Sequence, residues 1–149
     1  MTICRTFCPV LVKTATDTYK DFPEDLDIGE WLGDKSNVAL ADEEGDVSLF
    51  ERQPHQPQTV CGHYFFHSRG RKAIDSAEAF LEEIFTGPYD VQVIFGLTPL
   101  EHRAALWMNK RLGFTTYGTI DEDNIDPCEL VILTKQEWLQ LQQKATKNG

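Results

Sequence analysis

No run of apolar residues in this chain approaches the roughly 20 that a membrane-spanning helix needs. Residues 1–13 also lack a basic start followed by a long apolar stretch, so we expect neither a membrane segment nor a cleaved secretion signal. Repeats, low-complexity tracts and linkers rich in glycine or serine are missing too. We therefore expect a single domain over residues 1–149, located in the cytoplasm.

Basic residues are few. The chain has 14 Lys and Arg against 24 Asp and Glu, which gives a net charge of −10. A chain this acidic repels phosphate backbones, so general nucleic-acid binding is not expected, although a local basic patch is compatible with the total. Hydrophobic residues make up 41% and charged residues 26%, values typical of a folded globular protein.

The four cysteines are dispersed, and none belongs to a Cys-x-x-Cys pair. Without a secretion signal, a disulfide framework would be unusual at this length, so we interpret the cysteines as mostly buried thiols. A zinc site could combine Cys4 and Cys8 with His63 and His67. The spacing is loose and the two pairs lie far apart in sequence, so we predict no metal site.

The apolar pattern predicts an α/β (α+β) domain. Residues 73–84 carry apolar side chains at helical spacing, with acidic residues on the other face. The run over 91–97 does not alternate, as in a strand buried on both faces. The expected elements are a strand over Thr2–Phe7, helices over Val10–Tyr19 and Asp27–Leu32, a hairpin of Asn37–Ala41 with the stretch from Val47 to Phe50, a strand over Thr59–His67, a helix over Ala73–Phe85, a strand over Val91–Leu97, a helix opened by Pro99 and stopped by Gly113, strands over Phe114–Ile120 and Cys128–Thr134, and a terminal helix anchored by Trp138 and Leu141.

This order predicts a mixed sheet of about six to seven strands flanked by helices. The sheet is expected to be antiparallel at its start, with a parallel pair across the helix Ala73–Phe85. Leu112 and Phe114 flank the Gly113 stop and should be buried against the sheet. Trp31, Trp107 and Trp138 are most simply packing residues.

One turn carries a basic cluster. Arg69-Gly70-Arg71-Lys72-Ala73 joins a strand to a helix. The N-terminus of a helix has unpaired N–H groups and partial positive charge, and a glycine lets a phosphate approach the main chain. The turn is therefore a candidate phosphate cradle. A solvated basic turn is the alternative.

A second segment supports the cradle. Residues 101–114 read E-H-R-A-A-L-W-M-N-K-R-L-G-F. This resembles the late motif of the GNAT N-acetyltransferase superfamily, roughly E-N-x-A and then L-G-F, on the helix after the fifth strand. The basic turn stands where that family has its pyrophosphate loop, R-x-x-G-x-G/A. The resemblance extends over residues 37–134.

The resemblance implies a GNAT fold and a site for acetyl-coenzyme A (acetyl-CoA) between splayed fourth and fifth strands. Pantetheine would pair with the backbone near Tyr64–Phe66, and pyrophosphate would lie on the amides of Arg69–Ala73. A backbone N–H near Phe65 would polarise the thioester carbonyl. The cofactor-binding residues implied in this way are Tyr64, Phe65, Phe66, Ser68, Arg69, Gly70, Arg71, Lys72, Ala73, His102 and Asn109.

The chain departs from the family pattern at several positions. The two small residues of the loop are replaced by Lys72 and Ile74, which could crowd a phosphate, although Lys72 could also bind it. His102 stands where the family often has asparagine. Asn109 replaces a frequent tyrosine and cannot serve as a general acid near pH 7.

The strand before the loop contains no glutamate that could act as a base. Its titratable candidates are His63 and His67, which the even step of four residues would place on one face. Each could instead be an ordinary core or surface histidine.

The function that follows is transfer of an acetyl group from acetyl-CoA to an unidentified amine by direct attack. Acidic residues over 121–126 could attract a cationic amine or simply form a solvated loop. The alternative is an inactive GNAT-like binding or assembly protein, because the short, divergent form is similar to GNAT-like proteins of bacteriophages. A second copy of the chain, as a homodimer, or a virion protein could be a further partner, and a protein encoded by a bacteriophage would be located in the host cytoplasm or the virion.

Overall fold

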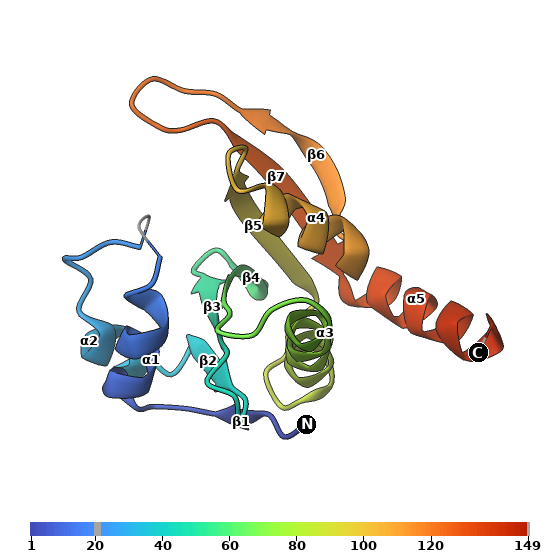
Figure 1. Ribbon diagram of the computed structural model, residues 1–149, viewed down its shortest axis with the longest axis horizontal. Coiled ribbons are helices and arrows are strands. Elements are labelled where there is room, and N and C mark those ends of the chain that lie inside the picture. Colours follow the sequence, from blue (N-terminus) through green and yellow to red (C-terminus); the bar gives the residue numbers. More distant parts are fainter. Residues whose placement is uncertain (20–21, 149) are drawn as a thin grey trace.

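The computed structural model describes residues 1–19 and 22–148, with the side chains of 147 and 148 left out (Figure 1). A seven-stranded mixed sheet has the order β1-β2-β3-β4-β5-β7-β6. The elements are β1 (Cys4–Arg5), α1 (Pro9–Thr16), α2 (Ile28–Gly33), β2 (Val38–Ala41), β3 (Val47–Gln53), β4 (Gln56–Phe65), α3 (Arg71–Thr86), β5 (Val93–Pro99), α4 (Arg103–Leu112), β6 (Thr115–Ile120), β7 (Cys128–Thr134) and α5 (Lys135–Asn148).

Helices α1 and α2 cover one face of the sheet, where they pack on β2, β3 and β4. Alternate residues of these strands point toward the two helices, among them Leu49 and Phe65. They pack with Val12 of α1 and Leu32 of α2. The α2 helix begins where the Asp27 carboxylate accepts the Glu30 N–H at 3.0 Å.

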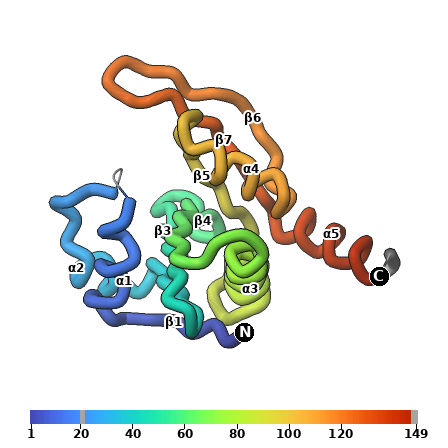
Figure 2. The backbone as a smooth tube through the Cα atoms, viewed as in Figure 1, coloured from blue at the N-terminus to red at the C-terminus, as the bar shows by residue number. Residues whose placement is uncertain are grey.

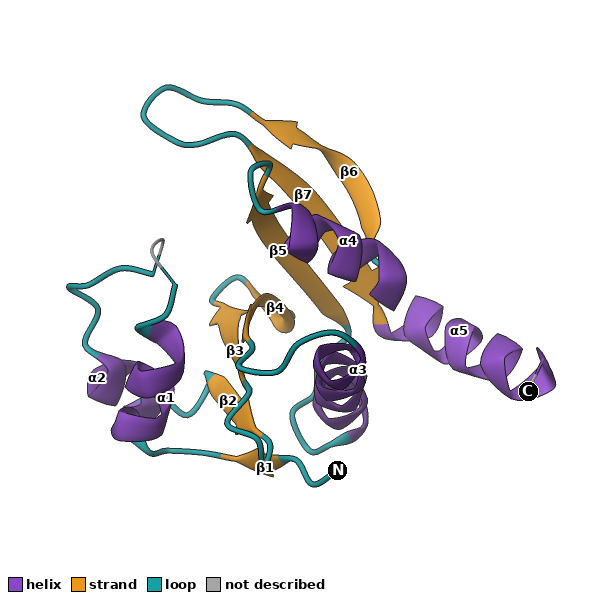
Figure 3. Ribbon diagram, viewed as in Figure 1, coloured by secondary structure: helices purple, strands orange, loops and turns teal. Residues whose placement is uncertain are grey.

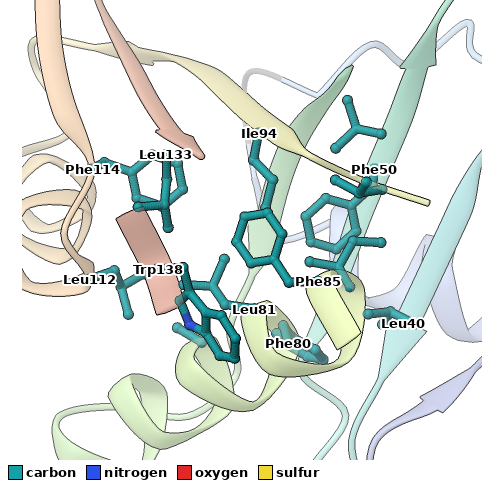
Figure 4. Close-up of a cluster of buried hydrophobic side chains, with 14 of the residues drawn as sticks. Leu40, Phe50, Phe80, Leu81, Phe85, Ile94, Leu112, Phe114, Leu133 and Trp138 are labelled. Atoms are coloured by element: carbon teal, nitrogen blue, oxygen red, sulfur yellow. The ribbon is translucent and has the colours of Figure 1, made fainter. Parts of the chain in front are cut away.

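Helices α3, α4 and α5 contribute to the core on the other face. The apolar stripe of α3 follows helical spacing, and Phe80, Leu81 and Phe85 are at most 2% exposed. They gather with Phe50 of β3 and Ile94 of β5 (Figure 4). The same cluster includes residues at the helix ends and on β7, namely Leu112, Phe114, Val131, Leu133 and Trp138.

Strands β4 and β5 are the parallel pair. Their register joins Thr59 to Val93, Val60 to Ile94 and Cys61 to Phe95. Past Cys61 and Phe95 no further pair links the two strands in the described chain, although β4 continues to Phe65 and β5 to Pro99. In Figure 3 the β5-β7-β6 half of the sheet lies apart from the β1–β4 half.

The predicted mixed sheet, its antiparallel start and its parallel pair are confirmed. Leu112 and Phe114 are each 7% exposed, as expected. The prediction that Pro99 opens a helix is wrong, because Pro99 ends β5 in register with Cys128, and α4 begins at Arg103.

Two burial predictions are also wrong. The strand from Val91 is not buried on both faces, since α3 and α4 cover one face and leave Leu97 48% exposed. Trp107 points outward from α4 and is 56% exposed, whereas Trp138 is buried.

The cysteines are not mainly buried thiols. Cys4 and Cys8 are exposed, and Cys61 and Cys128 are half-buried. Over residues 1–19 and 22–148, no group of three or more His, Cys, Asp or Glu side chains is arranged to hold a metal ion. None of the helices in these ranges combines the length and apolar character required to cross a membrane.

Candidate functional site

The separation of β4 from β5 leaves two strand edges facing each other. On its other edge β4 still pairs with β3, and β5 still pairs with β7. Gly62 and Gly96 lie where the separation begins, and a Cβ on Gly96 would stand 3.7 Å from the Gly62 carbonyl oxygen. Unpaired strand edges offer N–H and C=O groups to an extended ligand.

The N-terminus of α3 lies directly after this open part of β4. Gly70 precedes the helix with φ +60° and ψ −131°, a conformation that favours glycine, and nothing lies within 4 Å of a Cβ built there. The first N–H to be accepted inside the helix is that of Ile74, by the Gly70 carbonyl at 3.3 Å. The preceding N–H groups at Arg71, Lys72 and Ala73 therefore remain available to an anion.

Three basic side chains surround this N-terminus. Arg69, Arg71 and Lys72 are all exposed, and Arg71 Nε lies 3.2 Å from Asp75 Oδ1 in an exposed ion pair. Ile74 is buried instead. Of the two residues that replace small ones in the loop, Lys72 thus points to solvent and Ile74 points into the protein.

A buried carboxylate holds the loop between β4 and α3. Asp46 is 0% exposed, and its Oδ1 accepts the N–H groups of His67 at 2.6 Å and Ser68 at 3.0 Å. Burial alone would raise the pKa of Asp46, but the hydrogen bonds from Ser68, Ser76 and His67 outweigh it and hold the pKa below its ordinary value. Asp46 is therefore a carboxylate at neutral pH.

The same carboxylate connects the loop to the helix. Ser76 of α3 is fully buried, and its Oγ lies 2.8 Å from Asp46 Oδ2 and 2.7 Å from Asp42 Oδ2. Asp42 Oδ1 in turn accepts the N–H groups of Glu44 and Asp46. The turn between β2 and β3 is thereby bound to both the loop and the first turns of α3.

Sequence reasoning missed this arrangement. The sequence predicts only a hairpin between residues 37–41 and 47–50, since nothing in the local pattern pairs its turn with a serine of a later helix. We refer to Asp42, Asp46 and Ser76 as the loop tether.

On the sheet face that α1 and α2 cover in part, one cross-strand row lies at the last paired position before the opening. The strand registers align Glu51 of β3 with Cys61 of β4, Cys61 with Phe95 of β5, and Phe95 with Ile132 of β7. His63 lies two residues farther along β4, with Nε2 3.6 Å from Cys61 Sγ. Trp31 of α2 donates its Nε1–H to Glu51 Oε2 at 3.1 Å.

The surrounding protein sets the protonation states of His63 and Cys61. His63 reaches solvent, but the protein around it disfavours the charged ring and lowers its pKa, against the smaller opposing effect of Glu51. Burial and then Glu51 raise the pKa of Cys61 to about 11. At neutral pH His63 is a neutral base, and Cys61 is a thiol rather than a thiolate.

Sequence reasoning also missed Glu51. The strand before the loop has no glutamate, and Glu51 comes from the neighbouring strand β3. Only the hairpin register, with Glu51 opposite Cys61, could have indicated it.

His67 does not share a strand face with His63, so that geometric prediction is wrong. β4 ends at Phe65, and the two bonds to Asp46 bend the chain at His67. The His67 ring lies instead against the turn between β2 and β3, with Cδ2 3.2 Å from a Cβ built on Gly45.

The aromatic residues at the end of β4 face both sides of the sheet. On the α3 side, Tyr64 stacks on Phe66 with 6.1 Å between the ring centroids. The Tyr64 hydroxyl is buried and has no hydrogen-bond partner in the described chain. Phe65 packs edge-on to Tyr19 and Phe22 on the opposite side. The Phe66 N–H donates to the Tyr19 hydroxyl at 2.9 Å, so this amide already has an acceptor.

On the β5 side of the opening, α4 is fastened to the strand. Asn109 Nδ2 donates to Thr98 Oγ1 at 2.9 Å. His102 stands at the N-cap of α4, with Nε2 4.0 Å from Glu101 Oε1. The acidic residues over 121–126 are exposed in the loop between β6 and β7, which extends from one end of the molecule (Figure 2).

Comparison with known proteins gives matches in structure alone. The chain matches no model of a known protein family and no curated protein sequence. A mutant of the spermidine N-acetyltransferase SpeG from Vibrio cholerae superposes with a TM-score of 0.74 at 10% identity, over 95% of this chain and 99% of that one.

Two further structures agree. The yncA structure from Salmonella typhimurium, solved with its cofactor acetyl-CoA, gives a TM-score of 0.66 at 12% identity, over 90% and 93% of the two chains. The smu.2055 structure from Streptococcus mutans gives 0.67 at 14% identity, over 91% and 99%. With its separated β4 and β5, and with α3 beginning beside their open edges, this protein has the fold of the GNAT acetyltransferases.

Proposed function

We propose that the protein is an N-acetyltransferase that binds acetyl-CoA between β4 and β5 and transfers the acetyl group to an amine. The observation that carries the proposal is the loss of pairing after Cys61 and Phe95, directly before a helix N-terminus with three available N–H groups. An extended pantetheine fits unpaired strand edges, and a pyrophosphate fits the start of α3.

The residues present fit this group. The N–H groups of Arg71, Lys72 and Ala73 would hold the pyrophosphate, with the exposed basic side chains around it. Gly70 leaves space for a close approach to the backbone. The loop tether fixes the chain just before these groups without using their N–H donors.

The reaction needs a neutral amine beside the thioester. In direct attack the amine nitrogen forms a bond to the acetyl carbon, the C–S bond breaks, and the sulfur leaves with the bonding electrons. His63 accepts the proton that the amine loses, since its lowered pKa keeps it neutral at pH 7. Glu51 stabilises the imidazolium that results.

Cys61 does not carry the acetyl group in this mechanism. Its raised pKa, about 11, leaves almost none of it as thiolate at neutral pH. Its place beside His63 makes it part of the wall of the site.

A second candidate is an inactive protein that binds an acyl-CoA without turnover. Asn109 favours it, since this residue stands at the position of a frequent tyrosine acid and is engaged with Thr98. Such a protein would bind acetyl-CoA and acetylate no amine.

The experiment that tests the proposal is an acetyl-transfer assay with a panel of amines, following free CoA thiol and the mass of the product. The active enzyme should release thiol and acetylated amine in equal amounts, and His63→Gln should be slower. Binding of acetyl-CoA with no product from any amine would favour the inactive protein.

A further inference from the structure

The sheet has an apolar area beside the proposed reaction centre. Among the described residues, the cluster that α1 and α2 form includes none from β5 or β7, and the side chains of these two strands on that face are partly buried or exposed. Leu97 is 48% exposed, and Leu130 and Ile132 are half-buried. The turn between β3 and β4 borders this area and, with the sheet, lines a hollow of about 460 Å³ that is open to solvent.

The hollow is lined by apolar side chains of the sheet and by polar and proline residues of the turn between β3 and β4. The lining residues include no Asp, Glu, Lys or Arg among those described. They are Gln53, Pro54, His55, Gln56, Thr59, Val93, Phe95, Leu130 and Ile132. A volume of several hundred Å³ with an apolar floor suits one aryl group or a short alkyl chain.

The hollow adjoins the proposed base. Phe95 lines it and is the cross-strand partner of Cys61, whose other partner is Glu51. His63 is two residues from Cys61 on the same face, a step of about 7 Å along a strand. A molecule with its body on Phe95 can therefore extend one end to His63.

Charge distinguishes the two ends. The exposed Glu51 carboxylate lies in the same row as Phe95 and would attract an ammonium group on its way to the base. A second ammonium group placed on the hollow would find no carboxylate among the described lining residues, so it would gain no ion pair there while covering apolar surface.

We propose that the acceptor is a primary amine with one apolar body, an arylalkylamine or an alkylamine, whose body occupies the hollow while its nitrogen lies between Glu51 and His63. This inference rests on the proposed acetyltransferase function. It predicts selection against polyamines, the substrates named for the SpeG neighbours.

The test compares kcat/KM for 2-phenylethylamine, hexylamine, ethanolamine and spermidine at saturating acetyl-CoA. The two apolar amines should exceed the two polar ones by about tenfold or more, the usual effect of filling an apolar pocket. Equal values, or a preference for spermidine, would overturn the inference while leaving the acetyltransferase proposal intact.

Two variants test whether the apolar amine binds in the hollow. Leu130→Ser should raise KM for 2-phenylethylamine about tenfold and leave acetyl-CoA binding unchanged, whereas Leu139→Ser, an exposed leucine of α5, should change neither. Because Leu130 is only half-buried, the variant should fold, and its melting curve checks this.

Other outcomes are decisive as well. If Leu130→Ser leaves KM unchanged, the hollow is not the acceptor subsite. If sedimentation shows a dimer that Leu130→Ser dissociates, the face belongs to a second copy of the chain, and the inference is overturned. If acetyl-CoA does not bind at all, the proposed function fails and the acceptor inference fails with it.

Discussion

The loop tether leads to a quantitative prediction for Asp46→Asn. The amide has nearly the shape of the carboxylate, and its oxygen can still accept the N–H groups of His67 and Ser68. Hydrogen bonds to a charged group contribute roughly 1.5–3 kcal/mol and those to a neutral group roughly 0.5–1.5 kcal/mol. Because two bonds are weakened in this way, Asp46→Asn should lower the free energy of unfolding by about 2 kcal/mol at pH 7.

The dependence on pH identifies the carboxylate as the cause. Since the folded pKa of Asp46 lies below its unfolded value, its contribution is complete above the unfolded pKa and is lost as pH falls through the folded pKa. A protonated Asp46 resembles asparagine, so parent and variant should converge in acid.

The assay is urea unfolding of both proteins between pH 7 and pH 3. Asp75→Asn is the matched control on α3, because the Asp75 pair with Arg71 is exposed and should cost less than about 0.5 kcal/mol. A cost for Asp46→Asn below that of the control, or a cost that stays constant on acidification, would refute the assigned role of the tether.

Four further predictions follow from burial and charge. Phe114→Ala should cost about 3–5 kcal/mol in denaturant titration, as large core truncations do, and a loss below about 1 kcal/mol would contradict the packing of this helix end. At saturating amine, kcat should rise with pH through a midpoint below the ordinary 6.5 of histidine, and His63→Ala should lack this rise; an identical profile would exclude His63 as the base. Cys61→Ala should keep its transfer rate within a few-fold and form no acetylated enzyme, whereas an acetyl thioester trapped on the parent would contradict direct attack. Arg71→Ala and Lys72→Ala should each bind acetyl-CoA about tenfold more weakly than the parent, a loss of roughly 1.5 kcal/mol, and keep the parent's melting temperature. Equal affinity of variant and parent by calorimetry would show that these side chains belong to a solvated turn that does not bind the cofactor.

The fold could be predicted from the sequence because local patterns carried it. The helical spacing of Phe80, Leu81 and Ile84, and the Leu-Gly-Phe ending at Phe114, correctly indicated a helix on the sheet and a buried helix end. Pro99 was misread because proline suits both a helix start and a strand end, and only the pairing of β5 with β7 decides between them.

The candidate site was predictable only where it is continuous in sequence. The basic turn and Gly70 were visible as a strand-to-helix junction, and the structure places them at the start of α3. Glu51 and Asp46 were missed because their roles depend on a cross-strand register and on a contact with a helix 30 residues later. Such long-range contacts leave no signal in a local pattern.

The central claim is that the opening between β4 and β5 holds acetyl-CoA, and calorimetric titration with acetyl-CoA tests it most directly. We expect saturable binding of one equivalent, and a stabilisation of about 2.7 kcal/mol at a hundredfold excess over the dissociation constant. Absence of binding heat and of any shift in melting temperature at millimolar acetyl-CoA would contradict the claim.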